Sequence, residues 1–135
     1  DMTASPELIA PQTYLDYELE YQSRQFAAIS VPTLLHICGK VDSIVEWMGQ
    51  TGPSALSLEP KADLQVAREK CGPDIVFMGG VDVAKTLFLH GPDDVRKESE
   101  MAIANGIQIL APGCAVGPGT ANENLLAMLE VAKAH

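Results

Sequence analysis

The sequence is poor in aromatic residues and in positive charge. Only 5% of the 135 residues are Phe, Trp or Tyr, and nine Lys and Arg residues stand against 18 acidic ones, for a formal net charge of −9. Nucleic acids and anionic membrane surfaces bind clusters of basic side chains, and this chain has no such cluster. No apolar run approaches the roughly 18 residues of a membrane span. We therefore expect neither a nucleic-acid partner nor a membrane.

Cysteine is also scarce. The chain has three cysteines, an odd number, which argues against a disulfide framework and favours free or metal-bound thiols in a reducing compartment. We expect a cytoplasmic protein.

The chain does have a regular alternation of short apolar segments and amphipathic ones. The apolar segments predict strands at residues 31–36, 55–58, 75–79 and 107–111. The segments between and after them predict helices at 41–50, 62–70, 93–104 and 121–133, and a longer helix precedes them at 11–29. Thr120 and Glu123 have the spacing of a capping box for the last helix.

Strands that alternate with helices of about ten residues indicate an α/β fold with a parallel sheet. A doubly wound sheet and a (β/α)8 barrel share this pattern, although no G-x-G-x-x-G follows any strand, which weakens the dinucleotide-binding version. A complete barrel needs about 250 residues, so a barrel chain of this length would be about half of one. The chain begins at Asp1 rather than Met, as a fragment or a processed piece would, and we expect one folding unit over residues 1–135.

Four potential metal ligands follow three of the predicted strands. His36 closes the first strand with Cys38 two positions later, Glu59 follows the second, and Cys114 follows the fourth. The carboxyl ends of parallel strands meet at one edge of the sheet, so we expect these side chains to converge. One nitrogen, two sulfur and one oxygen donor suit a tetrahedral Zn²⁺ ion. The sequence predicts a zinc site at His36, Cys38 and Cys114, with Glu59 as a fourth ligand.

Other candidates have simpler interpretations. Cys71, at a helix end, is interpreted as a structural thiol, His90 as a solvated loop residue and His135 as the terminal residue. Asp82 follows the third strand and either lines a substrate pocket or caps the next helix, and both alternatives stay open. Glu59 has an alternative role as a solvated cap of the helix that follows it.

The predicted ligand set favours a catalytic site over a structural one. A structural zinc knot uses closely paired C-x-x-C ligands, and none occur here. A zinc ion with two cysteine ligands holds an added thiol as a thiolate and keeps its sulfur nucleophilic, which suits alkyl transfer to a thiol better than hydrolysis. No catalytic residue beyond the metal ligands is predicted.

These residues lie in segments that resemble a known family, the methylcobamide:coenzyme M methyltransferases of the uroporphyrinogen decarboxylase superfamily of (β/α)8 barrels. The resemblance is to the C-terminal half of the barrel and runs from about residue 5 to 132. His36, Cys38 and Cys114 are similar to the family's zinc motif, which true decarboxylases lack, and Glu59 has a counterpart in the related cobalamin-independent methionine synthase. The segments are LLHICGKVDSIVEWMGQTG, LSLE, IVFMGGVD and ILAPGCAVGPGTANENLLAM.

The resemblance implies transfer of a methyl group from a methylated corrinoid, held by a corrinoid-carrying partner protein, to a zinc-bound small thiol such as coenzyme M. The cofactors would be Zn²⁺ and the methylated corrinoid, and a further partner would be the missing half-barrel or another copy in an oligomer. Two alternatives stay open at this stage. One is a decarboxylase-like enzyme that acts on a tetrapyrrole without a metal, and the other is a non-catalytic fragment that binds a metal or a corrinoid.

Overall fold

The computed structural model describes residues 3–135 and has a four-stranded parallel sheet at its centre. The strands are β1 (Leu34–His36), β2 (Ala55–Leu58), β3 (Val76–Val81) and β4 (Ile109–Pro112), and each pairs with its sequence neighbour in the order β1-β2-β3-β4. Neighbouring parallel strands joined by helices in chain order form the repeating unit of a (β/α)8 barrel. The predicted α/β class, with four parallel strands of a half-barrel, is confirmed.

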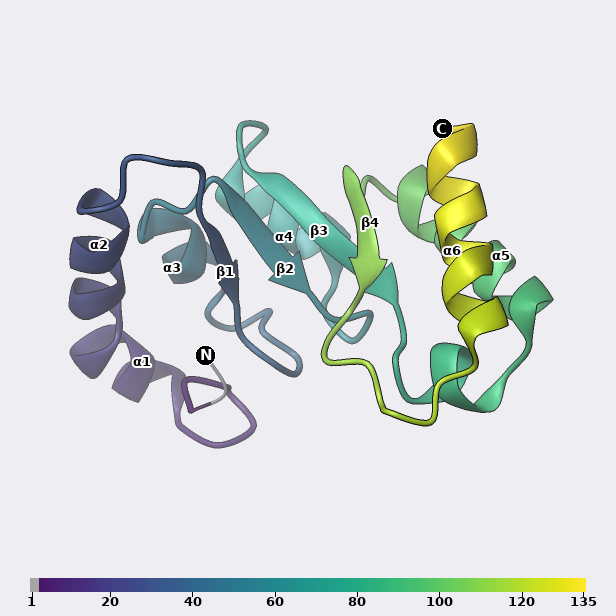
Figure 1. Ribbon diagram of the computed structural model, residues 1–135. Coiled ribbons are helices and arrows are strands. Elements are labelled where there is room, and N and C mark those ends of the chain that lie inside the picture. Colours follow the sequence, from purple (N-terminus) through teal and green to yellow (C-terminus); the bar gives the residue numbers. More distant parts are fainter. Residues whose placement is uncertain (1–2) are drawn as a thin grey trace.

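The helices cover one face and both sides of the sheet. In Figure 1, α3 and α4 lie behind the sheet, α1 and α2 lie on the β1 side, and α5 and α6 lie on the β4 side. No helix among residues 3–135 is long and apolar enough to cross a membrane. The bounds are α1 Pro11–Tyr17, α2 Leu19–Ala27, α3 Val45–Gln50, α4 Leu64–Cys71, the π-helical turn η1 Lys85–Leu89, α5 Pro92–Ala104 and α6 Asn122–Ala134.

The core lies between the sheet and the helices behind it. Leu35, Leu56 and Phe77 occupy equivalent positions on three paired strands, and all three are buried. They belong to one apolar cluster with residues of α3 and α4, among them Met48 and Ala67. Packing against α3 and α4 thus closes this face of the sheet.

Several predicted boundaries shift for local reasons. The expected helix over 11–29 is two helices, because the backbone at Glu18 departs from regular helix with a φ of −105°. The first strand begins at Leu34 rather than at residue 31, since Pro32 has no N–H to donate to a neighbouring strand. The helix expected from residue 41 begins at Val45, because the preceding residues form a turn.

The predicted capping box of the last helix is wrong. Helix α6 begins after Ala121, which makes no side-chain capping bond, so the N-cap falls one residue after Thr120. Thr120 belongs to the preceding turn, where its N–H donates to the Gly117 carbonyl. Helix α4 is capped by Asp63, whose carboxylate accepts the N–H groups of Gln65 and Val66. The α4 cap is therefore not Glu59, which removes the capping alternative for that residue.

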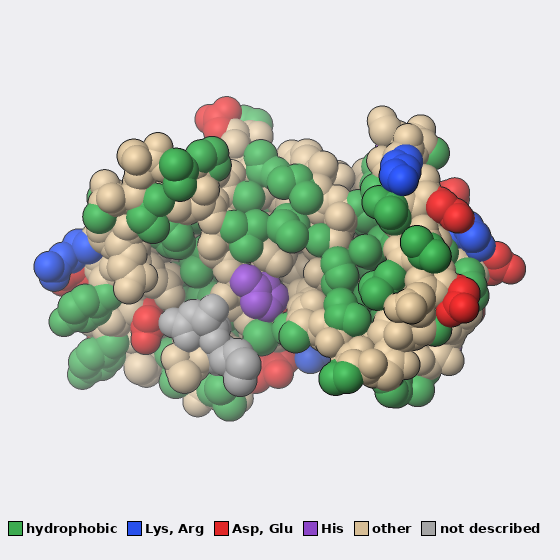
Figure 2. All heavy atoms as spheres, viewed as in Figure 1, with side chains coloured by type: hydrophobic (Ala, Val, Ile, Leu, Met, Phe, Trp, Pro, Cys, Tyr) green, Lys and Arg blue, Asp and Glu red, His purple; other side chains and the backbone are tan. Residues whose placement is uncertain are grey.

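The front face of the sheet exposes apolar side chains. Leu34 on β1 and Ile109 on β4 are 42% and 45% exposed. Figure 2 shows hydrophobic side chains gathered across the middle of this face. Within residues 3–135, β1 and β4 each pair on one side only. This face and these two edges are the surfaces that a closed barrel buries.

Candidate metal centre

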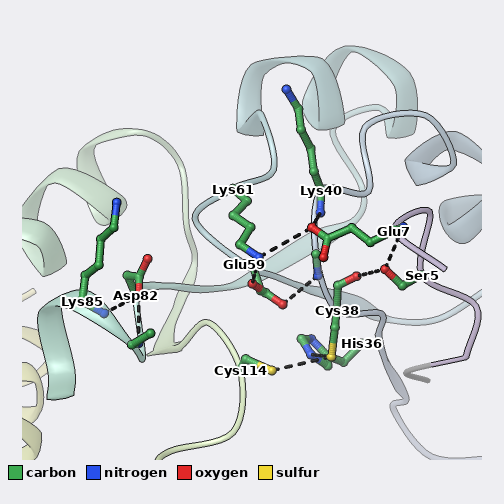
Figure 3. A network of polar contacts seen from close by, with 12 residues as sticks. Ser5, Glu7, His36, Cys38, Lys40, Glu59, Lys61, Asp82, Lys85 and Cys114 are labelled. Carbon is green, nitrogen blue, oxygen red and sulfur yellow. Dashed lines mark hydrogen bonds and ion pairs between the residues drawn. The ribbon is translucent and has the colours of Figure 1, made fainter.

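Four side chains converge at the carboxyl edge of the sheet, as the strand ends predict. One donor atom from each of His36, Cys38, Glu59 and Cys114 lies within 4.8 Å of the others. The Cys38 sulfur is 3.4 Å from His36 Nε2 and 3.6 Å from the Cys114 sulfur (Figure 3). Tetrahedral Zn²⁺ with ordinary bond lengths separates two sulfur ligands by about 3.8 Å and a sulfur from a nitrogen by about 3.6 Å. The donor set and its spacing therefore fit the ion.

Glycines let the ligand loops approach one another. Gly39, directly after Cys38, has a φ of +89°, a left-handed conformation that side chains disfavour. Gly113, directly before Cys114, lies so close to its surroundings that an added Cβ would be 2.6 Å from Pro60 Cδ. The Gly113 N–H donates to the carbonyl of Val81, at the end of β3. The loop after β4 is thereby held close to the residues that follow β2.

The His36 ring is oriented by its neighbour in the sheet. His36 pairs in register with Ser57, and its Nδ1 lies 3.1 Å from the Ser57 carbonyl oxygen and 3.1 Å from the Ser57 hydroxyl. Donation from Nδ1–H to the carbonyl leaves Nε2, the atom near Cys38, as the acceptor nitrogen that can bind a metal. Metal-binding histidines commonly have this type of second hydrogen bond.

Glu59 is held from two sides. Its Oε1 accepts the Gly39 N–H at 2.7 Å, and its Oε2 lies 3.7 Å from the Lys61 ammonium. The same ammonium lies 3.5 Å from Glu7 Oε1. Glu59 and then Glu7 raise the pKa of Lys61, so this side chain stays charged beside them. The carboxylate is thus anchored to the Cys38 loop and balanced by a cation.

The Cys38 thiol lies in surroundings that disfavour a free thiolate. Burial raises its pKa, and the hydrogen bond and charge of Cys114 and the charge of Glu59 raise it further. A divalent cation held by these donors would supply positive charge to offset the repulsion. The Cys38 carbonyl accepts a hydrogen bond from the Ser5 hydroxyl at 2.8 Å, which fixes the loop backbone.

The remaining candidates lie outside the four-residue cluster. Asp82 Oδ1 accepts the N–H groups of Ala84 and Lys85, each at 2.8 Å, so this carboxylate bonds to the backbone that leads into η1, whose N-cap is Ala84. The Cys71 sulfur donates to the Val45 carbonyl, and burial raises the pKa of the thiol, as suits a structural residue. The His90 side chain is 54% exposed and lies 3.9 Å from the Asp94 carboxylate. His135 is the last residue and lies outside the cluster.

Four residues around the site were not predicted from the sequence: Ser5, Glu7, Ser57 and Lys61. The register of β1 against β2 places Ser57 beside His36, so a correct strand alignment would have identified it. Ser5 contacts a residue 33 positions away. No local pattern signals a contact of that kind.

The chain is similar in sequence to known methyltransferases over part of their length. The chain is 35% identical over 131 residues to methylcobamide:CoM methyltransferase MtaA of Methanosarcina barkeri, which covers 96% of this chain and 38% of the relative. It is 33% identical over 136 residues to methylcobamide:CoM methyltransferase MtbA of Methanosarcina acetivorans, covering 98% of this chain and 40% of the relative. The chain thus spans about two fifths of the length of these curated relatives.

Structural similarity covers a similar share of a larger protein. A solved methyltransferase from Methanosarcina mazei superposes with a TM-score of 0.94 at 30% identity, over 99% of this chain and 40% of that one. The family model described as uroporphyrinogen decarboxylase (URO-D) matches residues 1–135, the whole chain. This chain therefore belongs to the uroporphyrinogen decarboxylase (URO-D) family.

Proposed function

We propose that the protein containing this chain transfers a methyl group from a methylated corrinoid, carried by a partner protein, to a thiol such as coenzyme M. We further propose that this chain holds the Zn²⁺ ion that activates the thiol. The observation that carries the proposal is the donor spacing, 3.4 Å from nitrogen to sulfur and 3.6 Å from sulfur to sulfur, which suits tetrahedral zinc. The similarity to methylcobamide:CoM methyltransferases supports the choice of reaction.

Each residue of the cluster has a distinct part in this proposal. His36, Cys38 and Cys114 would hold the ion, and Glu59 would be the fourth ligand, the one that gives way to the incoming thiol. Bound zinc would lower the pKa of that thiol, so that the thiol loses its proton without a dedicated base. Cys38 and Cys114 supply electron-rich sulfur donors, which keep the activated thiolate nucleophilic.

The transfer itself is a nucleophilic displacement. The thiolate sulfur attacks the methyl carbon and a carbon–sulfur bond forms, while the carbon–cobalt bond of the donor breaks and its electron pair stays with the cobalt. The thiol proton passes to solvent. Asp82 follows β3 at the same edge of the sheet and is our candidate for a substrate contact, since the N–H groups of Ala84 and Lys85 both bond to Oδ1.

The test is a turnover assay with the full-length protein that contains this chain, because the chain spans only about two fifths of its relatives. The zinc-loaded protein is mixed with methylcobalamin and coenzyme M, and the loss of methylcobalamin and the formation of methylated thiol are measured. We expect turnover that Cys38→Ala or Cys114→Ala abolishes and Cys71→Ala preserves.

Two outcomes would contradict this function. One is full methyl transfer by a protein that lacks both Cys38 and Cys114. The other is metal-independent decarboxylation of a tetrapyrrole with no methyl transfer, which would favour the decarboxylase alternative within the same family.

A further inference from the structure

A short network of charges connects the N-terminal segment to the metal ligands. The Lys61 ammonium lies between two carboxylates, 3.5 Å from Glu7 Oε1 and 3.7 Å from Glu59 Oε2. The other oxygen of Glu59 accepts the Gly39 N–H at 2.7 Å. Figure 3 shows Lys61 between Glu7 and Glu59, beside the Cys38 loop. Both oxygens of the fourth candidate ligand therefore already have a partner from the protein.

This network contributes little to the stability of the fold. The side chains of Lys61 and Glu7 are 55% and 54% exposed, and exposed ion pairs add about 0–1 kcal/mol. Glu59 differs, since its side chain is only 14% exposed. A charge beside a mostly buried carboxylate is screened less than one between two exposed groups. The positive charge of Lys61 therefore acts more strongly on the Glu59 carboxylate than on Glu7.

We infer that Lys61 is a positioning residue that keeps Glu59 exchangeable, so that a thiol can take the fourth position on the metal. This inference rests on the proposed function and deepens it. The Lys61 ammonium and a metal ion compete for the negative charge of one carboxylate. The bond from Glu59 to the metal is thereby weaker than it would be without the Lys61 ammonium beside Oε2.

The same contacts explain where Glu59 goes when a thiol replaces it. A buried carboxylate without a partner is costly. The Gly39 N–H and the Lys61 ammonium keep Glu59 paired after it leaves the metal. Its displacement therefore does not leave an unpaired negative charge.

The N-terminal segment holds Lys61 in place. Glu7 accepts the Lys40 N–H at 3.4 Å with the same oxygen that faces Lys61, and Ser5 donates to the Cys38 carbonyl at 2.8 Å. Residues 5–7 thus contact both the metal-binding loop and the lysine that balances Glu59. Their place beside the site is a consequence of this double contact.

The test compares Lys61→Met, which removes the charge at similar length, with Lys61→Arg, which keeps it. Lys40→Met is the matched control, because Lys40 pairs with Asp42 at 3.5 Å and its ammonium points away from Glu59 (Figure 3). Each full-length variant is loaded with Co²⁺, and coenzyme M is titrated while the cobalt absorption spectrum is recorded. Metal affinity is measured separately by competition with a chelator.

We expect Lys61→Met to bind the metal at least as tightly as the native protein, yet to need about tenfold more thiol for the spectral change. Lys61→Arg and Lys40→Met should stay within about twofold of the native protein in both measurements. In a Glu59→Gln background the Lys61→Met effect should vanish, since the two residues act through one contact.

A thiol titration of Lys61→Met that matches the native curve would overturn the inference. A Lys61→Met variant that loses both metal affinity and folding stability would also overturn the inference, because Lys61 would then have a structural role. The readouts do not involve methyl transfer. The predicted shift in a protein that fails to transfer methyl groups would therefore support this inference and contradict the proposed function.

Discussion

The sulfur atoms of Cys38 and Cys114 lie 3.6 Å apart although the two residues are 76 positions apart in the sequence. Their strands, β1 and β4, are the two edges of the sheet and are separated by β2 and β3. Three strand spacings amount to about 14 Å. The loops that follow β1 and β4 must therefore fold inward over the carboxyl ends of the central strands. This inward folding of loops creates the site.

Replacement of either clustered cysteine should remove the metal. We expect one zinc per chain in the native protein, and a loss of affinity of at least about 100-fold in Cys38→Ala and in Cys114→Ala, beyond the effects usual for outer-shell changes. Metal content after purification without added zinc checks this. Cys71→Ala is the control and should retain the metal, because Cys71 bonds to Val45 away from the cluster. Equal losses in all three variants would contradict the assignment.

The sequence predicted the parts of this site that depend on strand ends. His36, Glu59 and Cys114 could be placed together because the ends of parallel strands meet at one edge, wherever the strands begin. Contacts that depend on the path of irregular segments could not be placed. The contact between Ser5 and the Cys38 carbonyl is of this kind, because no periodic pattern links the two segments.

Local patterns failed where one residue decided the outcome. The capping-box spacing is present at Thr120, but the Thr120 N–H bonds to the Gly117 carbonyl in a turn. The N-cap of α6 is therefore Ala121, one residue later. The long helix before the sheet was predicted as one because its composition does not reveal the distortion at Glu18. Neither error affects the site, since both lie in elements that do not carry ligands.

Two glycine substitutions should separate the effect of backbone strain on stability from an effect on metal binding. Gly39 and Gly52 both have a φ of +89°, so alanine at either position should cost about 1–2 kcal/mol of unfolding free energy. An added Cβ at Gly39 would lie 2.8 Å from Glu7 Cδ, whereas one at Gly52 would have nothing within 4 Å. Glu7 must move away from the new methyl group, and the oxygen that moves is the one that faces Lys61.

We therefore expect similar losses of stability in urea for Gly39→Ala and Gly52→Ala, but altered metal binding in Gly39→Ala alone. The shift in metal affinity should be about tenfold, as for other residues that orient ligands. Equal metal affinities in the two variants would show that Glu7 has no influence on the site.

The edges of the sheet should exchange amide hydrogens faster than its centre. Strands β2 and β3 are paired on both sides, and β1 and β4 on one side within residues 3–135. Unpaired edges and exposed apolar groups also promote self-association. We expect exchange at least about tenfold faster in β1 and β4, together with oligomers in size-exclusion chromatography. Leu34→Lys and Ile109→Lys, at positions 42% and 45% exposed, should reduce the oligomers. Uniform protection in a monomer would contradict an open half-barrel.

Tyr14 should make the fold sensitive to alkaline pH. Its ring is fully buried and stacked on Trp47, and its hydroxyl donates to Gln22 Oε1 at 2.7 Å. Burial, with a smaller contribution from Glu18, raises the pKa of Tyr14 well above its usual range. In the unfolded chain the phenol loses its proton near pH 10. Above that pH the unfolded state binds fewer protons than the folded state, so the free energy of unfolding falls as pH rises.

The stabilisation linked to Tyr14 is thus complete below about pH 10 and decreases above it, with a limiting slope of about 1.4 kcal/mol per pH unit. Tyr14→Phe should lower the free energy of unfolding by about 1 kcal/mol at neutral pH through the lost hydrogen bond. Above about pH 10 the free energy of unfolding of this variant should fall less steeply than that of the native protein. Tyr17→Phe is the matched control, because Tyr17 lies on the same helix with its side chain 68% exposed. Burial also raises the pKa of Cys71, so all variants are compared in a Cys71→Ala background by urea unfolding. If the free energies of unfolding of Tyr14→Phe and Tyr17→Phe fall in parallel as pH rises, the ionisation of the Tyr14 phenol is not what destabilises the fold at alkaline pH.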